Sequence, residues 1–148
     1  MGTQNSVILL VEDDRNDALL AEKALRKAGI SNPIIHLNDG EEAIKYFSGE
    51  APFDDRAKHP LPMLVLLDLK MPKLTGFDVL TWLQNRPELA ASIPVVVLTG
   101  SIHPEDIANA KKLGAVGYEV KPVNFAQLVS MAETLRFRIA KGPDQMPP

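Results

Sequence analysis

The chain has 148 residues, which is long enough for one domain with a substantial hydrophobic core. Its 45% hydrophobic and 24% charged residues are ordinary for a soluble protein, and a net charge of −3 gives no reason to expect binding to nucleic acid or to anionic membranes. The absence of cysteine excludes disulfides and a thiolate nucleophile, and apolar runs of about five residues are too short to span a bilayer. Because the polar start at residues 1–6 lacks a signal-like segment, we expect a cytoplasmic protein.

Apolar segments of strand length alternate with segments of helical periodicity along the chain. Residues 50–62 interrupt this alternation with a proline-rich loop that is long for a compact α/β domain. The predicted strands cover residues 7–11, 33–37, 63–67, 94–98 and 116–120. Five helices are predicted. The first and the last are indicated by apolar stripes, from Leu19 to Ala28 and from Phe125 to Ile139. The other three are expected from after Asp39 to about Gly49, from Thr75 to before Pro87, and from Pro104 to Gly114.

Five β/α units in this order favour an α/β fold, in which helices cover both faces of a parallel sheet. Right-handed crossovers and short connections leave few topologies for such a doubly wound five-stranded parallel sheet. The pattern contains no internal repeat and no sign of a second domain. We therefore predict one domain over residues 6–141 and a flexible tail over residues 142–148.

Polar residues of complementary chemistry follow four of the predicted strands. Glu12 and Asp13 follow the first strand, Asp68 the third, Thr99 the fourth and Lys121 the fifth. Because ligand chemistry gathers at the carboxyl ends of parallel strands, we expect these side chains at one rim of the sheet. Clustered carboxylates repel one another, and oxygen ligands without histidine or cysteine favour a hard divalent cation such as Mg²⁺. With an amine and a hydroxyl nearby, Asp68 is equipped to accept a phosphoryl group.

These residues resemble the motifs of response-regulator receiver domains of two-component signalling, over residues 6 to about 140. The resemblance implies a flavodoxin-like receiver fold with the strand order 2-1-3-4-5 and a switch point between the first and third strands. It implies Asp68, Thr99 and Lys121 as the catalytic residues, with Asp68 as phosphoacceptor. The Mg²⁺ ligands that it implies are Glu12, Asp13, Asp68 and the carbonyl of Lys70. It implies Thr99 and Tyr118 as the switch residues, and a cis peptide bond between Lys121 and Pro122.

A narrower resemblance is to the stand-alone regulators that are paired with bacterial phytochrome-type histidine kinases. It lies in the loop at 50–62, in the run 94–99 and in the run 121–125. It implies a sensor histidine kinase or phosphotransfer protein as the partner, and output through a changed protein surface rather than through DNA binding. No enzymatic turnover is expected beyond self-dephosphorylation. An outward-facing apolar excess on the last helix would indicate a homodimer or partner surface, formed with the fifth strand and the helix before it.

Simpler structural roles compete with these assignments at several positions. Asp14 and Asp17 are expected to cap and charge the first helix rather than to bind metal. Tyr118 has an alternative role in packing at the edge of the sheet. Trp82 lies unevenly on its helical stripe, which predicts a partly exposed side chain that still packs, and His36 is expected to be a packed strand residue.

Two other functions remain open on the sequence alone. Hydrolases of the haloacid dehalogenase type also form an aspartyl-phosphate, but they carry the nucleophile on the first strand and a second acid two residues after it. Here the nucleophile follows the third strand, and the residue two positions on is Lys70. A phosphorylation-independent scaffold of the same fold is the second alternative, and the intact set of site residues argues against it.

Overall fold

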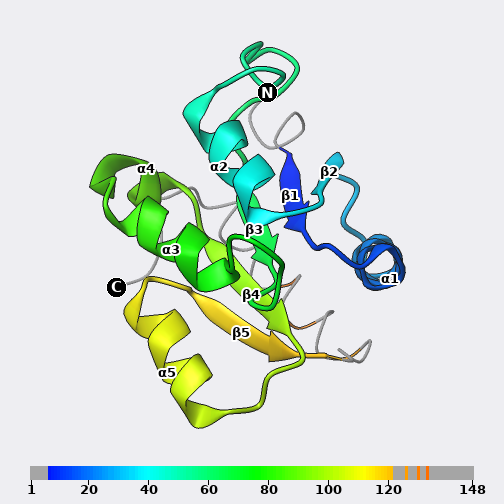
Figure 1. Ribbon diagram of the computed structural model, residues 1–148. Coiled ribbons are helices and arrows are strands. Elements are labelled where there is room, and N and C mark those ends of the chain that lie inside the picture. Colours follow the sequence, from blue (N-terminus) through cyan, green and yellow to red (C-terminus); the bar gives the residue numbers. More distant parts are fainter. Residues whose placement is uncertain (1–6, 122–125, 127–129, 131–132, 134–148) are drawn as a thin grey trace.

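The computed structural model describes residues 7–121 together with residues 126, 130 and 133. Its centre is a five-stranded parallel sheet in the order β2-β1-β3-β4-β5, which confirms the predicted topology (Figure 1). The strands are β1 Ile8–Val11, β2 Ile34–Leu37, β3 Leu64–Leu67, β4 Val95–Thr99 and β5 Gly117–Val120. The chain leaves β1 for β2 on one side and returns to β3 on the other, so the switch point lies between β1 and β3.

The helices within the described residues follow the predicted alternation, with one addition. They are α1 Arg15–Lys27, α2 Gly40–Ser48, α3 Gly76–Gln84, α4 Pro87–Ser92 and α5 Pro104–Lys112. The sequence pattern does not predict α4. The helix α3 ends before Pro87, as expected. Pro87 is also the first residue of α4, a position where a helix needs no N–H. No helix in this part of the chain is long and apolar enough to cross a bilayer.

Three predictions fall outside the described residues. The predicted last helix, with its stripe from Phe125 to Ile139, is described only at residues 126, 130 and 133. The tail over residues 142–148 is not described at all. Pro122 is also outside the described set, so the cis geometry of the Lys121–Pro122 peptide stays a prediction.

Both faces of the sheet are buried, because alternate side chains of each strand point to opposite sides. Leu9 and Val11 of β1 belong to a cluster with residues of α2, α3 and α5. Ile8 and Leu10 belong to the other cluster, together with residues of α1. In agreement, Figure 1 shows α1 apart from the group formed by α2, α3, α4 and α5. This doubly wound arrangement leaves the carboxyl ends of the strands free to carry polar side chains.

The buried face of α1 differs from the predicted stripe. Leu19 and Leu20 were expected to share that stripe, but they are 51% and 65% exposed. Leu25 of the predicted stripe is buried, and so is Ala18, seven residues before it, which is two helical turns. The buried face of α1 is thus made of Ala18 and Leu25 with partly buried alanines beside them, and the helix starts after Asp14, whose carboxylate caps it.

The loop at residues 50–62 is anchored to the end of α2 by one guanidinium group. Arg56 Nη1 donates to the carbonyl oxygens of Tyr46 (2.8 Å) and His59 (3.1 Å), and Nη2 donates to that of Phe47 (2.8 Å). The Tyr46 hydroxyl donates to the carbonyl oxygen of Pro60 at 2.7 Å. Carbonyl groups in the last turn of a helix lack their usual amide partner four residues on; the Tyr46 carbonyl accepts from the Gly49 amide at 3.2 Å, and Arg56 supplies further donors to Tyr46 and Phe47. The loop is therefore part of the fold despite its length.

Candidate functional site

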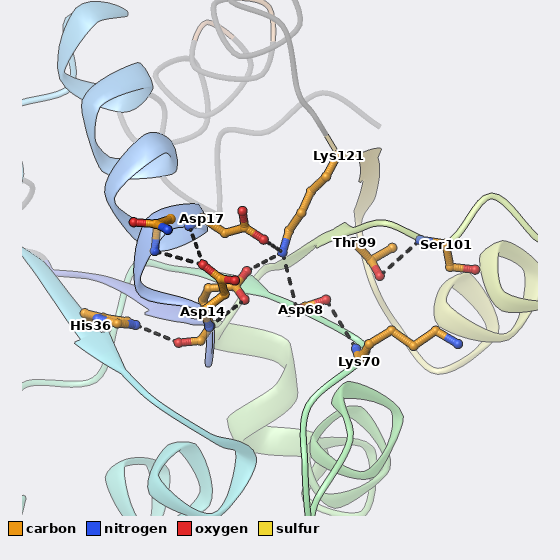
Figure 2. Close-up of polar contacts among 10 residues, drawn as sticks. Asp14, Asp17, His36, Asp68, Lys70, Thr99, Ser101 and Lys121 are labelled. Atoms are coloured by element: carbon orange, nitrogen blue, oxygen red, sulfur yellow. Dashed lines mark hydrogen bonds and ion pairs between the residues drawn. The ribbon is translucent and has the colours of Figure 1, made fainter.

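The predicted site residues meet at one rim of the sheet, where strands β1, β3, β4 and β5 end. Val11 is paired with Leu67 across β1 and β3, so Glu12 and Asp68 leave neighbouring strands at the same level. Thr99 is the last residue of β4, and the amide of Lys121 donates to the Thr99 carbonyl at 2.7 Å. Figure 2 shows Lys121 reaching back from its strand end towards Asp68 and Asp17.

The Lys121 ammonium is shared among three carboxylates. It donates to Glu12 Oε1 at very short range, to Asp17 Oδ2 at 3.0 Å and to Asp68 Oδ2 at 3.4 Å (Figure 2). Glu12 is 3% exposed and Asp68 is 6% exposed, so two of these acids are almost removed from water. Buried charges of this kind are tolerated when they are paired, and Lys121 supplies the pairing.

Backbone groups hold the two buried acids in place. The amide of Lys70 donates to Asp68 Oδ1 at 3.2 Å, and the amide of Asp14 donates to Glu12 Oε2 at 3.1 Å. Gly76, at the start of α3, lies so close to the strand end that an added Cβ would stand 2.4 Å from the Asp68 carbonyl oxygen. The absence of a side chain at Gly76 is therefore what lets α3 begin against the loop that carries Asp68.

Glu12, Asp13 and Asp68 form a group that could hold a metal ion. One carboxylate oxygen from each lies within 4.8 Å of the others, and Asp13 is exposed while its two neighbours are buried. Three carboxylates with no nitrogen or sulfur donor suit a hard cation such as Mg²⁺. The residues present therefore fit a divalent ion of that class.

Burial and the contacts between Glu12 and Lys121 have opposite effects on the pKa values of these two residues. Burial raises the pKa of Glu12 from 4.5 to about 7, with the nearby charge of Asp68 adding to the effect and the hydrogen bond from Lys121 opposing it. Burial alone would lower the pKa of Lys121, but the hydrogen bonds to Glu12 and Asp17 and the charge of Asp68 hold it above its ordinary value. Lys121 therefore stays charged, and the rim carries more negative charge than one ammonium can balance.

A second set of contacts connects the rim to α5. Thr99 Oγ1 accepts from the amide of Ser101 at 3.4 Å, and the Tyr118 hydroxyl donates to the Ser101 carbonyl at 3.1 Å. The Ser101 hydroxyl donates to Asp106 Oδ2, which also lies 3.8 Å from Lys70 Nζ. Tyr118 thus does more than pack at the edge of the sheet, since its hydroxyl holds the loop between β4 and α5.

Sequence reasoning missed some residues that the structure adds to the rim. Asp14 caps α1 as predicted, but the carboxylate of Asp17 pairs with Lys121 instead of charging the helix end alone. His36 was expected to be a packed strand residue, and its Nε2 lies 2.7 Å from the Glu12 carbonyl oxygen. Nothing in a single sequence pairs residues that lie on different strands in this way.

Comparison with known proteins agrees with this geometry. The model of the response regulator receiver domain matches residues 8–133. Response regulator Rcp1 from Synechocystis sp. is 35% identical over 127 residues, which are 86% of this chain and 84% of Rcp1. The crystal structure of the Mn²⁺-bound form of Rcp1 aligns with a TM-score of 0.76 at 32% identity, over 97% of this chain and 99% of that chain. The bacteriophytochrome response regulator RtBRR aligns with a TM-score of 0.78 at 40% identity, over 88% of this chain and 78% of that chain.

These matches decide between the functions that the sequence left open. The family match covers the sheet and the rim together, and the position of Asp68 after β3 differs from the first-strand nucleophile of haloacid dehalogenase-type hydrolases. The bacteriophytochrome and Rcp1 structures support the narrower resemblance as well. The chain belongs to the family of response regulator receiver domains.

Proposed function

We propose that Asp68 of this receiver domain accepts a phosphoryl group from a phosphohistidine. The observation that carries the proposal is the position of its buried carboxylate between two kinds of charge. Lys121 Nζ lies 3.4 Å from Asp68 Oδ2, and oxygens of Glu12 and Asp13 lie within 4.8 Å of the Asp68 carboxylate. A nucleophilic carboxylate with a fixed ammonium beside it can take a phosphoryl group without leaving the new negative charge unbalanced.

In the proposed step, a carboxylate oxygen of Asp68 forms a bond to phosphorus while the bond from phosphorus to the histidine nitrogen breaks. The electron pair of that bond leaves with the imidazole nitrogen, which needs no further reactant. Lys121 donates to the phosphoryl oxygens from the β5 side. Thr99 lies fully buried at the end of β4 and is the proposed hydroxyl donor to one of them. Small-molecule phosphodonors such as acetyl phosphate serve the same chemistry.

Mg²⁺ is the proposed cofactor. Glu12, Asp13 and Asp68 would hold it, together with the carbonyl of Lys70 that the resemblance implies. When bound, a dication neutralises charge on the transferring oxygens. The Mn²⁺-bound form of Rcp1 supports a divalent ion in a protein of this kind.

The proposed partner is a sensor histidine kinase or a phosphotransfer protein, with a phytochrome-type kinase as the narrower proposal. The likeness to Rcp1 and to the bacteriophytochrome regulator RtBRR supports it. A net charge of −3 favours output by protein contact over DNA binding.

The proposed location is the cytoplasm, where such kinases present their phosphohistidine. The proposed receiver domain spans residues 6–141, of which the family match covers 8–133. The proposed protein activity is limited to accepting a phosphoryl group and to its own dephosphorylation.

The proposed output surface lies on α5 and β5. Tyr118 and Ser101 connect this part of the molecule to Thr99 at the rim. Ile102 and Val116, near the two ends of α5, are 71% and 50% exposed, so apolar side chains are available for a partner or for a second copy of the chain. A shift between two arrangements of the Tyr118 contact is the proposed switch. Tyr118→Phe removes the donor to Ser101 and is expected to change the amide signals of the β4–α5 loop while leaving the phosphoryl acceptor intact.

The phosphoacceptor is tested by incubation with acetyl phosphate and Mg²⁺, followed by intact-mass spectrometry. The wild-type chain is expected to gain one phosphoryl adduct that is stable in acid and labile in base. Asp68→Asn should abolish it, whereas the control Asp54→Asn, at an exposed loop position, should leave it unchanged. An adduct of equal size in Asp68→Asn would place the acceptor elsewhere and overturn the proposal.

The metal site is tested separately by thermal unfolding with and without Mg²⁺. An ion that binds only the folded protein raises its unfolding temperature. The rise is expected in the wild type and is expected to be lost in Asp13→Asn, because Asp13 is an exposed member of the group whose change leaves the core untouched. Equal rises in the two proteins would exclude Asp13 from the site.

A further inference from the structure

Asp17 uses its carboxylate in an unusual way for an acid in the first turn of a helix. The first-turn amides of α1 are already served, because Asp14 Oδ1 accepts from the amides of Asn16 (2.8 Å) and Asp17 (3.0 Å). The carboxylate of Asp17 instead reaches Lys121 Nζ at 3.0 Å, across 104 positions of sequence. Figure 2 shows the two side chains pointing at each other above the rim.

The geometry makes Asp17 a competitor of Asp68 for the same ammonium. Lys121 Nζ is nearer to Asp17 Oδ2, at 3.0 Å, than to Asp68 Oδ2, at 3.4 Å. An ammonium has three N–H donors, and Glu12, Asp17 and Asp68 together engage all of them. Any donor that Lys121 gives to a phosphoryl oxygen must therefore be withdrawn from one of these carboxylates. Asp17 is the most exposed of the three, with a side-chain exposure of 40% against 4% and 7%.

We propose that Asp17 is a positioning residue that draws the Lys121 ammonium away from Asp68, and that it thereby shortens the lifetime of the phosphoryl group on Asp68. This inference rests on the proposed function of Asp68. At rest Asp17 gives Lys121 a partner on the α1 side of the rim. After transfer the same carboxylate competes with the phosphoryl oxygens for the ammonium. Removing the charge at Asp17 leaves Lys121 with one partner fewer and allows a closer contact with the phosphoryl group.

The expected effect is a gain, which separates it from damage to the fold. A partly exposed ion pair corresponds to a change of about two- to fivefold in an equilibrium. Asp17→Asn is therefore expected to lengthen the phosphoryl lifetime by about two- to fivefold, and to raise its occupancy at limiting acetyl phosphate. Asp17→Glu keeps a carboxylate that can reach Lys121 and should return the lifetime towards that of the wild type. Glu22→Gln makes the same change of charge elsewhere on α1 and should have no effect.

A double-mutant cycle distinguishes action through Lys121 from a simple loss of negative charge near the phosphoryl group. The lifetimes are measured by intact-mass spectrometry after removal of acetyl phosphate, in the wild type, Asp17→Asn, Lys121→Met and the double variant. The gain from Asp17→Asn is expected to disappear in the Lys121→Met background. A gain of the same size in both backgrounds would mean that Asp17 acts by charge alone and would overturn the positioning role. A shorter lifetime in Asp17→Asn would overturn the competition.

A measurement without phosphorylation keeps the inference separate from the proposed function. The ammonium ¹H–¹⁵N signal of Lys121 is visible by NMR when hydrogen bonds slow its exchange with water. Asp17→Asn should shift or broaden that signal, and Asp17→Glu should retain it. An unchanged signal in Asp17→Asn would refute the pairing whatever happens at Asp68. A wild-type chain that takes no phosphoryl group would overturn the proposed function and with it the competition, while the signal would still report the resting pair.

Discussion

In the metal-free protein, Glu12→Gln should gain stability relative to the wild type as the pH rises from acidic to neutral. Glu12 is 3% exposed, and burial raises the pKa of its carboxyl from 4.5 to about 7. Because the folded-state pKa is the higher one, the folded protein binds more protons than the unfolded chain between these two values. The contribution of Glu12 to stability is therefore fully present below pH 4.5 and is lost as the pH rises to about 7.

The size of the effect follows from the same two values. Each pH unit of difference corresponds to about 1.4 kcal/mol, so the interval from 4.5 to about 7 corresponds to roughly 3 kcal/mol. Lys121 does not contribute in the window, because its pKa is held above its ordinary value of 10.5. Burial also raises the pKa of Glu119, but Glu119 is present in both proteins and cancels in the difference.

The assay is urea unfolding of the wild type and Glu12→Gln in a chelator, at several pH values from 4.5 to 8. The difference in unfolding free energy should move in favour of Glu12→Gln by up to about 3 kcal/mol across that range. Glu50→Gln, at an exposed loop position, serves as the control and should run parallel to the wild type. A constant difference between the wild type and Glu12→Gln would show that the ion pair with Lys121 fully compensates the burial of Glu12, and would refute the reasoning.

Two further predictions concern the residues that support the rim and the loop at 50–62. Gly76→Ala should lower the unfolding free energy by about 1–3 kcal/mol and shift the backbone at Asp68, because its Cβ would stand 2.4 Å from the Asp68 carbonyl oxygen. Gly100→Ala, with no atom within 4 Å of the added Cβ, is the matched control, and equal effects of the two changes would contradict the steric argument. Arg56→Ala should lower the unfolding free energy measured in urea by about 2 kcal/mol or more, because it removes charged donors from buried carbonyls. The exposed Lys58→Ala should be near neutral, and equal losses in the two variants would show that the Arg56 contacts are unimportant.

The sheet was predictable because its signals are local and repeated. Five apolar runs predict five strands, the chemistry after four of them predicts that these ends share one rim, and the strand order follows from the family resemblance. The first helix shows the limit of such reasoning. Leu19 and Leu20 are as apolar as Leu25, yet only Leu25 is buried, because burial depends on how the helix packs on the sheet as well as on residue type.

The rim was predictable in its members but not in its pairings. The ends of parallel strands bring the backbones of Glu12, Asp68 and Lys121 to one rim, independently of side-chain conformation. Which oxygen each donor contacts depends on the reach of a long lysine side chain and on the entry of α1. Asp17 therefore could not be separated from an ordinary helix-charging residue on sequence grounds. The contact between His36 and the Glu12 carbonyl is of the same kind, since it depends on the register of β1 against β2.

Stability and chemistry oppose each other at this rim. Glu12, Asp17 and Asp68 pair with one ammonium, and Asp13 adds a fourth carboxylate near Glu12 and Asp68, so the strand ends hold more negative than positive charge. Burial, with the charge of Asp68 adding to it, disfavours the ionised form of Glu12, which is why Glu12→Gln is expected to gain stability at neutral pH without metal. The same excess is what attracts a dication, so Glu12→Gln should also lose the stabilisation by Mg²⁺ that the wild type is expected to show. Strain of this kind is commonly stored where a protein binds its ligand, and here it is electrostatic rather than conformational. A variant that gained stability in chelator and still responded fully to Mg²⁺ would separate the two effects and remove Glu12 from the metal site.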